Sequence, residues 1–307
     1  MDYSQILSQQ FNIKEEYAKN IITLLDDGNT IPFIARYRKE MHGSMDDQLI
    51  REFAEKLEYL RGLDKRRDEI RSLIDAQEKL TDEINLALDK AATLSELEDI
   101  YRPYRPKRKT RASIAKEKGL EPLANDILKQ EKGFDPSKSA VDYIDEEKGV
   151  TSVEDAIQGA MDIIAELVSD NAEIRKRIRN LTNANGVLVS VATDEEKDSV
   201  YKNYYDYKEP VKKIAGHRVL AVNRGEKEGF LKVSVETDSE KPLNSIFRAM
   251  ITDKNQLCSD IIREACTDAY QRLIYPSIER EVRNELTEKA EDGAISVFKK
   301  NLHQLLM

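Results

Sequence analysis

The residue types that most often carry chemistry are scattered along this sequence. Its three histidines (His42, His217 and His303) lie far apart, and Cys258 and Cys266 do not form a CxxC pair. No local spacing therefore supports a metal site. Neither a GxxxxGK[ST] loop nor a GxGxxG loop is present, and there is no GxSxG elbow, although a Ser-His-Asp arrangement could still be assembled in space. We expect no enzyme activity, no metal and no cofactor.

Positive charge is concentrated in residues 102–111, RPYRPKRKTR, which we call the basic segment. Its candidate nucleic-acid-binding side chains are Arg102, Tyr104, Arg105, Lys107, Arg108, Lys109 and Arg111. Cations neutralise phosphates and tyrosine rings stack on bases. Pro103 and Pro106 disfavour helix, so we expect extended or turn-like backbone here. Alternatively, the segment is a solvated loop whose arginines pair with acidic helices, and the sequence does not decide between the two.

Two weaker candidates accompany the basic segment. Arg36, Arg38 and Lys39 could line a helix that faces nucleic acid, but internal salt bridges of Arg36 and Arg38 between short helices are the favoured interpretation. The tyrosines of residues 201–207 could form a stacking platform, but packing against neighbouring strands is favoured.

The composition indicates a mainly helical protein. The 307 residues are 35% charged and 40% hydrophobic, with 12 Gly, 8 Pro and no Trp. A net charge of −9 argues against a nucleic-acid binder that is basic all over. Two cysteines are too few for a disulfide framework, and no apolar stretch has the length of a signal core or a membrane span. We therefore expect a cytoplasmic protein with no membrane partner.

Helix signals dominate the first 186 residues. Three short helices with tight turns are expected in residues 1–43, the second capped by Asn12, and they are typical of a helix-turn-helix-like unit. Ser44 and Asp47 have capping-box spacing, which predicts the start of a helix of about thirty residues, or about 45 Å. Thr81, Thr93 and Ser152 are expected to cap later helices.

The hydrophobic period changes near residue 187. Val187, Val189 and Val191 alternate as in a strand, and residues 218–222 and 230–235 are also strand-like. The expected fold class is mainly α: an elongated multi-helical scaffold with one small β patch. Its expected parts are the helix-turn-helix-like unit (1–43), a long helix and helical arm (44–186), the β-containing segment (187–240) and C-terminal helices (241–307).

Long strings of this sequence resemble the Tex family of bacterial transcription accessory proteins. They include NTIPFIARYRKEMHGSMDD, LEDIYRPYRPKRKTRASIAKEKGLEPLA and HRVLAVNRGEKEGFL, and the resemblance covers essentially the whole chain. It implies a role in transcription and RNA binding. It also implies that ribonuclease-H-like, helix-hairpin-helix and S1 domains follow in family members, so that this chain is an N-terminal region cut before them.

We therefore expect a scaffold region whose partners are nucleic acid, RNA or DNA, and the transcription machinery. One alternative is a protein-interaction scaffold that touches no nucleic acid, and strong salt dependence of binding would separate the two. A nuclease is the other alternative. It is disfavoured because the resemblance places the ribonuclease-H-like domain beyond this chain.

Overall fold

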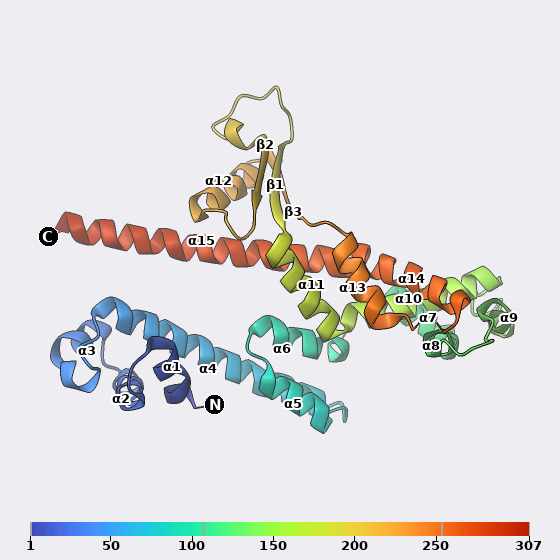
Figure 1. Cartoon of the computed structure of the whole chain (residues 1–307), viewed down its shortest axis with the longest axis horizontal. Coiled ribbons are helices and arrows are strands. Elements are labelled where there is room, and N and C mark those ends of the chain that lie inside the picture. Colours follow the sequence, from blue (N-terminus) through green and yellow to red (C-terminus); the bar gives the residue numbers. More distant parts are fainter. Residues whose placement is uncertain (1, 107, 253, 307) are drawn as a thin grey trace. The chain divides into compact units, whose positions relative to one another are not determined.

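The chain is mainly α-helical and carries one small antiparallel sheet, which confirms the expected fold class. The computed structural model describes residues 2–106, 108–252 and 254–306. Its contacts divide the chain into two compact units, an N-terminal unit (residues 1–104) and a C-terminal unit (residues 105–307), whose elements are labelled in Figure 1. The four finer segments expected from the sequence stay predictions.

Three short helices pack against the first half of a long one in the N-terminal unit (Figure 1). They are α1 (Tyr3–Phe11), α2 (Glu15–Asp26) and α3 (Ile31–Tyr37), followed by the 3-10 turn η1 (Lys39–Met41) and the long helix α4 (Asp47–Asp75). Leu7, Ile21, Ile34, Ile50 and Phe53 are fully buried in their shared core. Burial of these side chains, not helix propensity, stabilises helices this short.

Two of the expected helix caps are wrong. Asn12 ends α1 with a left-handed φ of 51° and does not cap α2, which follows Lys14. Helix α4 is capped by Asp46, whose carboxylate accepts the N–H of Leu49 at 2.7 Å, while Ser44 has φ 63°. Asparagine tolerates left-handed backbone well, so the same residue type serves at either end of a helix.

The second half of α4 supports a separate small core with α5 (Asp82–Lys90), α6 (Leu94–Tyr101) and the 3-10 turn η2 (Arg102–Tyr104). Thr81 and Thr93 cap α5 and α6 as expected. Arg67 lies on the buried stripe of α4 and donates to the carbonyls of Leu88 and Ala91 at 2.8 and 3.0 Å. A buried cation at the C-terminus of α5 thus satisfies carbonyls that have no partner within that helix.

The C-terminal unit holds the larger core. Its helices are α7 (Arg111–Glu117), α8 (Glu121–Lys129), α9 (Pro136–Ala140), η3 (Val141–Tyr143), α10 (Val153–Asp170), α11 (Ala172–Asn185), η4 (Lys202–Tyr204), α12 (Gly216–Lys227), α13 (Glu240–Met250), α14 (Gln256–Asp268) and α15 (Tyr275–Leu306). Helix α10, capped by Ser152 as expected, contacts α7, α8 and α14. A π-helical stretch, Ala269–Ile274, joins α14 to α15, so Pro276 sits where α15 restarts.

A three-stranded antiparallel sheet forms the β patch, in the order β2-β1-β3. Strands β1 (Val187–Ala192) and β3 (Leu231–Glu236) were expected. The structure pairs them with Leu188 opposite Val235. Strand β2 (Asp206–Pro210) includes Tyr207, the last residue of the tyrosine run, and was not expected. The strand expected at residues 218–222 is wrong, because that sequence belongs to α12. A short apolar run is compatible with a strand or with a helix. Here the run forms a helix, which packs against α15 and β3.

Buried charge and close backbone contact fix α15 to its neighbours. Glu281 of α15 accepts hydrogen bonds from Arg175 and Arg179 of α11 at 2.7 and 2.8 Å. A Cβ at Gly216 would stand 3.1 Å from Cα of Ala290, tighter than most Cβ contacts, so glycine favours the close approach of α12 to α15. Among the described residues, no helix is both long and apolar enough to cross a membrane.

Candidate nucleic-acid interface

Helical turns form both ends of the basic segment. Its first residues make the 3-10 turn η2, and Arg111 is the first residue of α7. Thr110 caps α7 through a reciprocal pair of hydrogen bonds with Ser113, at 3.0 and 2.8 Å. The 3-10 turn at Pro103 agrees with the turn-like backbone expected here, and Pro106 lies outside both helices.

Two candidates of the basic segment, Arg102 and Tyr104, belong to the N-terminal unit and are held by it. Arg102 is half-buried and interacts with a neighbouring group. Tyr104 is half-buried against the core of α4, α5 and α6, and its carbonyl accepts a hydrogen bond from Gln77 at 3.0 Å. Burial also raises the pKa of Tyr104. Little of its ring is left to stack on a base.

The candidates of the C-terminal unit are more accessible. Arg105, Arg108, Lys109 and Arg111 are all exposed, whereas Lys107 lies outside the described residues. Lys109 Nζ is 3.8 Å from the Glu117 carboxylate, and both side chains are about two-thirds exposed. Such a pair contributes little free energy and does not prevent a phosphate from competing for the lysine.

Acidic groups of α10 lie near the start of α7. Thr110 donates to the Glu166 carboxylate at 3.0 Å. Burial raises the pKa of Asp162, while the positive charges of Arg272 and Arg111 act in the opposite direction. Arg105 also has an interaction partner. The positive charge of the basic segment is therefore partly compensated by acidic groups of the fold. Both interpretations, nucleic-acid binding and a loop paired with acidic helices, keep support.

Arg36, Arg38 and Lys39 are exposed at the end of α3 and in η1. Within the described part of the chain, Arg36 and Arg38 form no ion pair, so the favoured interpretation of internal salt bridges is wrong. Sequence reasoning missed their aromatic neighbours: Phe33 and Tyr37 are 37% and 60% exposed. The spacing of four residues between these aromatics on an expected helix was the available signal.

The tyrosines of residues 201–207 pack as expected. Tyr201 is buried, and Tyr204, Tyr205 and Tyr207 are half-buried around a small core formed with Phe230. They are therefore not a free stacking platform.

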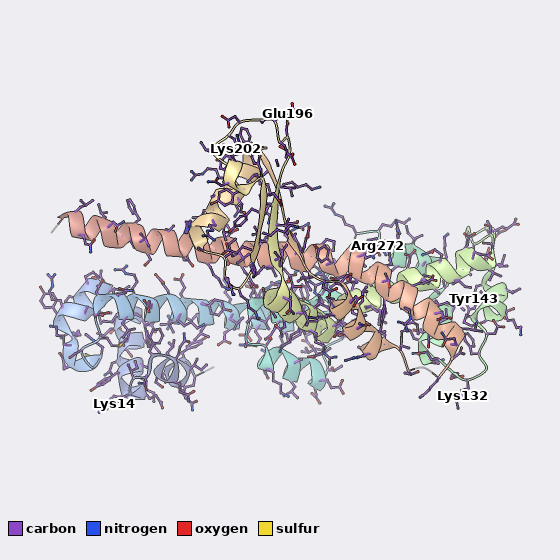
Figure 2. The ribbon with its side chains drawn as sticks, turned by 45° about the horizontal axis from the view of Figure 1, so that its top comes forward. Lys14, Lys132, Tyr143, Glu196, Lys202 and Arg272 are labelled. Atoms are coloured by element: carbon purple, nitrogen blue, oxygen red, sulfur yellow. The ribbon has the colours of Figure 1, made fainter. Side chains whose placement is uncertain are left out.

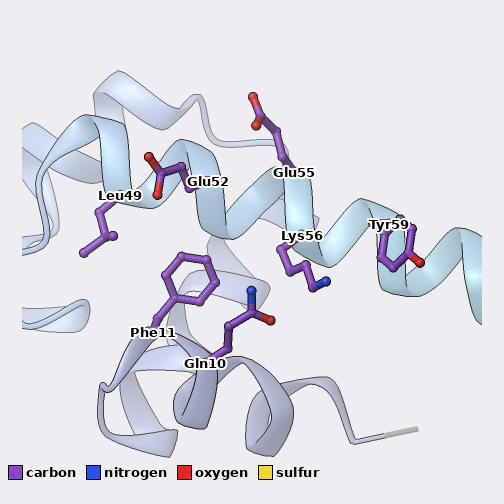
Figure 3. Close-up of a pocket in the computed structure, with 7 residues that line it drawn as sticks. All are labelled: Gln10, Phe11, Leu49, Glu52, Glu55, Lys56 and Tyr59. Atoms are coloured by element: carbon purple, nitrogen blue, oxygen red, sulfur yellow. The ribbon is translucent and has the colours of Figure 1, made fainter. Parts of the chain in front are cut away.

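Two other surfaces carry acidic side chains. In the loop between β1 and β2, Glu196 and Lys202 mark the far end of the sheet (Figure 2), and four carboxylates lie within residues 194–198. A groove of about 580 Å³ between α1 and α4 contains Phe11, Glu52, Glu55 and Lys56 (Figure 3). Neither surface suits a phosphate chain. No three His, Cys, Asp or Glu side chains in the described ranges are grouped as a metal ion would require.

The sequence of this chain matches known protein families. Residues 131–298, more than half of the chain, match the family described as Tex central region-like. The chain belongs to the Tex family. Residues 1–75 match the Tex-like protein N-terminal domain, so the Arg36–Lys39 cluster lies inside a matched region and the basic segment lies between the two.

Relatives of the Tex chain come from bacteria and from animals. It is 44% identical to the uncharacterized protein YdcI of Bacillus subtilis and 36% identical to the transcriptional accessory protein Tex of Neisseria gonorrhoeae. It is 31% identical to the human S1 RNA-binding domain-containing protein 1. Each alignment covers 100% of the chain but only 44%, 41% and 32% of the respective relative. The chain thus spans less than half the length of these proteins.

Proposed function

We propose that this chain is the helical scaffold region of a Tex-like transcription accessory factor, and that it binds nucleic acid, RNA in particular, in the cytoplasm. It acts without a catalytic centre of its own. Exposed Arg105, Arg108, Lys109 and Arg111 carry the proposal, because four cations within seven residues form a local positive field on an acidic chain. The relatives named for transcription and for S1 RNA binding support it.

A protein-interaction scaffold is the second candidate function. The contact between Lys109 and Glu117 and the engagement of Arg102 and Arg105 within the fold favour it. In that case the basic segment stabilises the chain, the partner is a component of the transcription machinery, and the helix-turn-helix-like unit contacts protein. The two functions differ in how binding responds to salt.

The test is a titration of the chain with single- and double-stranded RNA and DNA at two salt concentrations. The variant replaces four cations of the basic segment by alanine: Arg105, Lys107, Arg108 and Lys109. Each lost phosphate contact should flatten the log–log salt dependence by about 0.7 for single strands and about 0.9 for duplex DNA. Four contacts would therefore flatten it by at most about 3 to 4.

A matched control removes the same charge elsewhere in the C-terminal unit. It replaces four exposed lysines by alanine: Lys129, Lys132, Lys138 and Lys148. This control should bind like the unaltered chain if position matters, and like the segment variant if only net charge matters. Unchanged affinity and slope in a folded segment variant, with a lower Tm, would reject the nucleic-acid role of the basic segment and favour the scaffold. Nuclease turnover that survives stringent purification would contradict the absence of a catalytic centre.

A further inference from the structure

Helix α3 and the turn after it combine exposed aromatic rings with exposed cations. Phe33, Arg36 and Tyr37 are spaced i, i+3, i+4 and share one exposed face of α3, beside the buried Ile34. Arg38 and Lys39 follow directly and are also exposed. We call these five residues (Phe33, Arg36, Tyr37, Arg38 and Lys39) the α3 surface.

Contacts among these side chains order the α3 surface. The ring centroids of Phe33 and Tyr37 are 5.4 Å apart, with their planes inclined at 43°. The guanidinium of Arg38 lies 5.6 Å from the centroid of the Phe33 ring. Because adjacent rings and a guanidinium plane hold one another in place, a ligand that binds here would find flat surfaces already positioned.

A buried histidine holds the backbone beneath this surface. His42 is fully buried, and its Nε2 lies 3.1 Å from the carbonyl oxygen of Ile34. A carbonyl only accepts, so Nε2 carries the proton. The same carbonyl accepts the N–H of Arg38 at 3.0 Å. The turn that carries Arg38 and Lys39 is therefore anchored to the core of the N-terminal unit.

The cations of the α3 surface differ from other arginines of the N-terminal unit. Among the described residues, Arg36 and Arg38 have no carboxylate within ion-pair distance. Carboxylates do contact five other arginines of the unit: Arg51, Arg61, Arg66, Arg67 and Arg71. Only one acidic residue, Glu40, lies between residues 31 and 42. On an acidic chain, this surface keeps uncompensated positive charge beside exposed rings.

We infer that the α3 surface binds single-stranded nucleic acid, with bases stacked on its two rings and backbone phosphates on its three cations. The inference rests on the proposed nucleic-acid function and adds a second surface, separate in sequence from the basic segment. Aromatic rings stack on any base, and guanidinium groups pair with phosphates. A duplex hides its base faces, so this combination fits single strands.

The experiment measures binding of the full 307-residue chain to a fluorescent oligoadenylate of about twelve nucleotides, within the range of single-strand binding sites. An abasic oligomer of equal length keeps the phosphates and removes the bases. The double variant Phe33→Ala/Tyr37→Ala should bind the RNA at least about tenfold more weakly, because each stacked base contributes roughly a factor of five or more. Its affinity for the abasic oligomer and its salt slope should stay the same.

Two further variants separate stacking from charge and from loss of folding. Phe33→Tyr/Tyr37→Phe keeps both rings and should bind RNA like the unaltered chain. Replacing the three cations by glutamine should weaken binding of both oligomers and flatten the salt slope, by about 2 if all three contact phosphates. The matched control is Tyr59→Ala, because the Tyr59 ring is 44% exposed and has Lys56 Nζ 4.7 Å from its centroid, but lies beside Glu55 and Glu58.

Five results would overturn the inference. A folded Phe33→Ala/Tyr37→Ala variant that binds RNA like the unaltered chain would exclude stacking on this surface. Equal losses for the RNA and the abasic oligomer would do the same. Competition by a polyglutamate peptide as strong as that by RNA would indicate an acidic protein partner. Finally, if no oligomer binds the unaltered chain, the proposed function and this inference both fail, whereas binding that depends on the basic segment alone removes only the inference.

Discussion

The Glu281 carboxylate should determine how firmly α11 is held against α15. Arg175 is fully buried and its side chain donates to Glu281 Oε1 at 2.7 Å, while Arg179, 8% exposed, donates to Oε2 at 2.8 Å. Ser277 Oγ adds a bond to Oε1 at 3.2 Å. The substitution Glu281→Ala removes the carboxylate that both guanidiniums share.

The expected cost follows from burial. Removing one partner of a fully buried ion pair typically costs about 3–5 kcal/mol, because a desolvated charge is left behind. Glu281 is 29% exposed, so water can enter and we expect about 2–3 kcal/mol. For a unit of this size, that loss corresponds to a fall in Tm of roughly 5–10 °C.

Urea denaturation followed by circular dichroism measures this cost, and hydrogen exchange of the α11 amides shows whether the loss is local. The matched control is Asp126→Ala, which removes an exposed pair with Lys129 of the same 2.7 Å length in the same unit and should leave the transition unchanged. A loss below about 1 kcal/mol for Glu281→Ala would refute the reasoning. It would mean that the two arginines are satisfied without Glu281.

Three further predictions concern packing and titration. Phe53→Ala should destabilise the N-terminal unit by about 3–5 kcal/mol in urea denaturation, because Phe53 is fully buried in its core. Burial raises the pKa of Cys266 to about 12, so Ellman's reagent at about pH 8 should label it only after unfolding. Hydrogen bonding by Tyr207 and then by Arg218 lowers the pKa of Glu209 below its usual 4.5, so its contribution is present above pH 4.5 and disappears as the pH falls through the folded pKa. Glu209→Gln should therefore lower Tm near pH 7 and leave it unchanged near about pH 2.

Much of the fold could be predicted because local signals and tertiary packing agree. Thr81, Thr93 and Ser152 cap helices because a side-chain oxygen and a free backbone N–H meet within three residues. Strand β3 shows the period-two pattern of a half-buried sheet. Cys258 and Cys266, which do not form a CxxC pair, are both buried in α14.

The wrong predictions occur where the local sequence is equally compatible with two structures. Residues 219–222 form a short apolar run, which the structure places in helix α12 against α15. Asn12 has the side chain of a helix cap at either end, and its backbone conformation is set by the turn between α1 and α2. Neither outcome is encoded within the few residues concerned.

The candidate site was harder to predict than the fold, because ion pairing is a tertiary property. The basic helix around residues 172–183 and the cluster at residues 36–39 look alike as sequence. In the fold, Arg175 and Arg179 turn inward to one carboxylate, whereas Arg36 and Arg38 stay exposed beside two rings. Since an arginine already paired in a protein interior cannot release its charge to a phosphate, the count of cations in a segment overstates its capacity to bind nucleic acid. What matters on a chain of net charge −9 is which cations the fold leaves without a carboxylate, and by that measure the three cations of the α3 surface rival the six that the basic segment carries in its sequence.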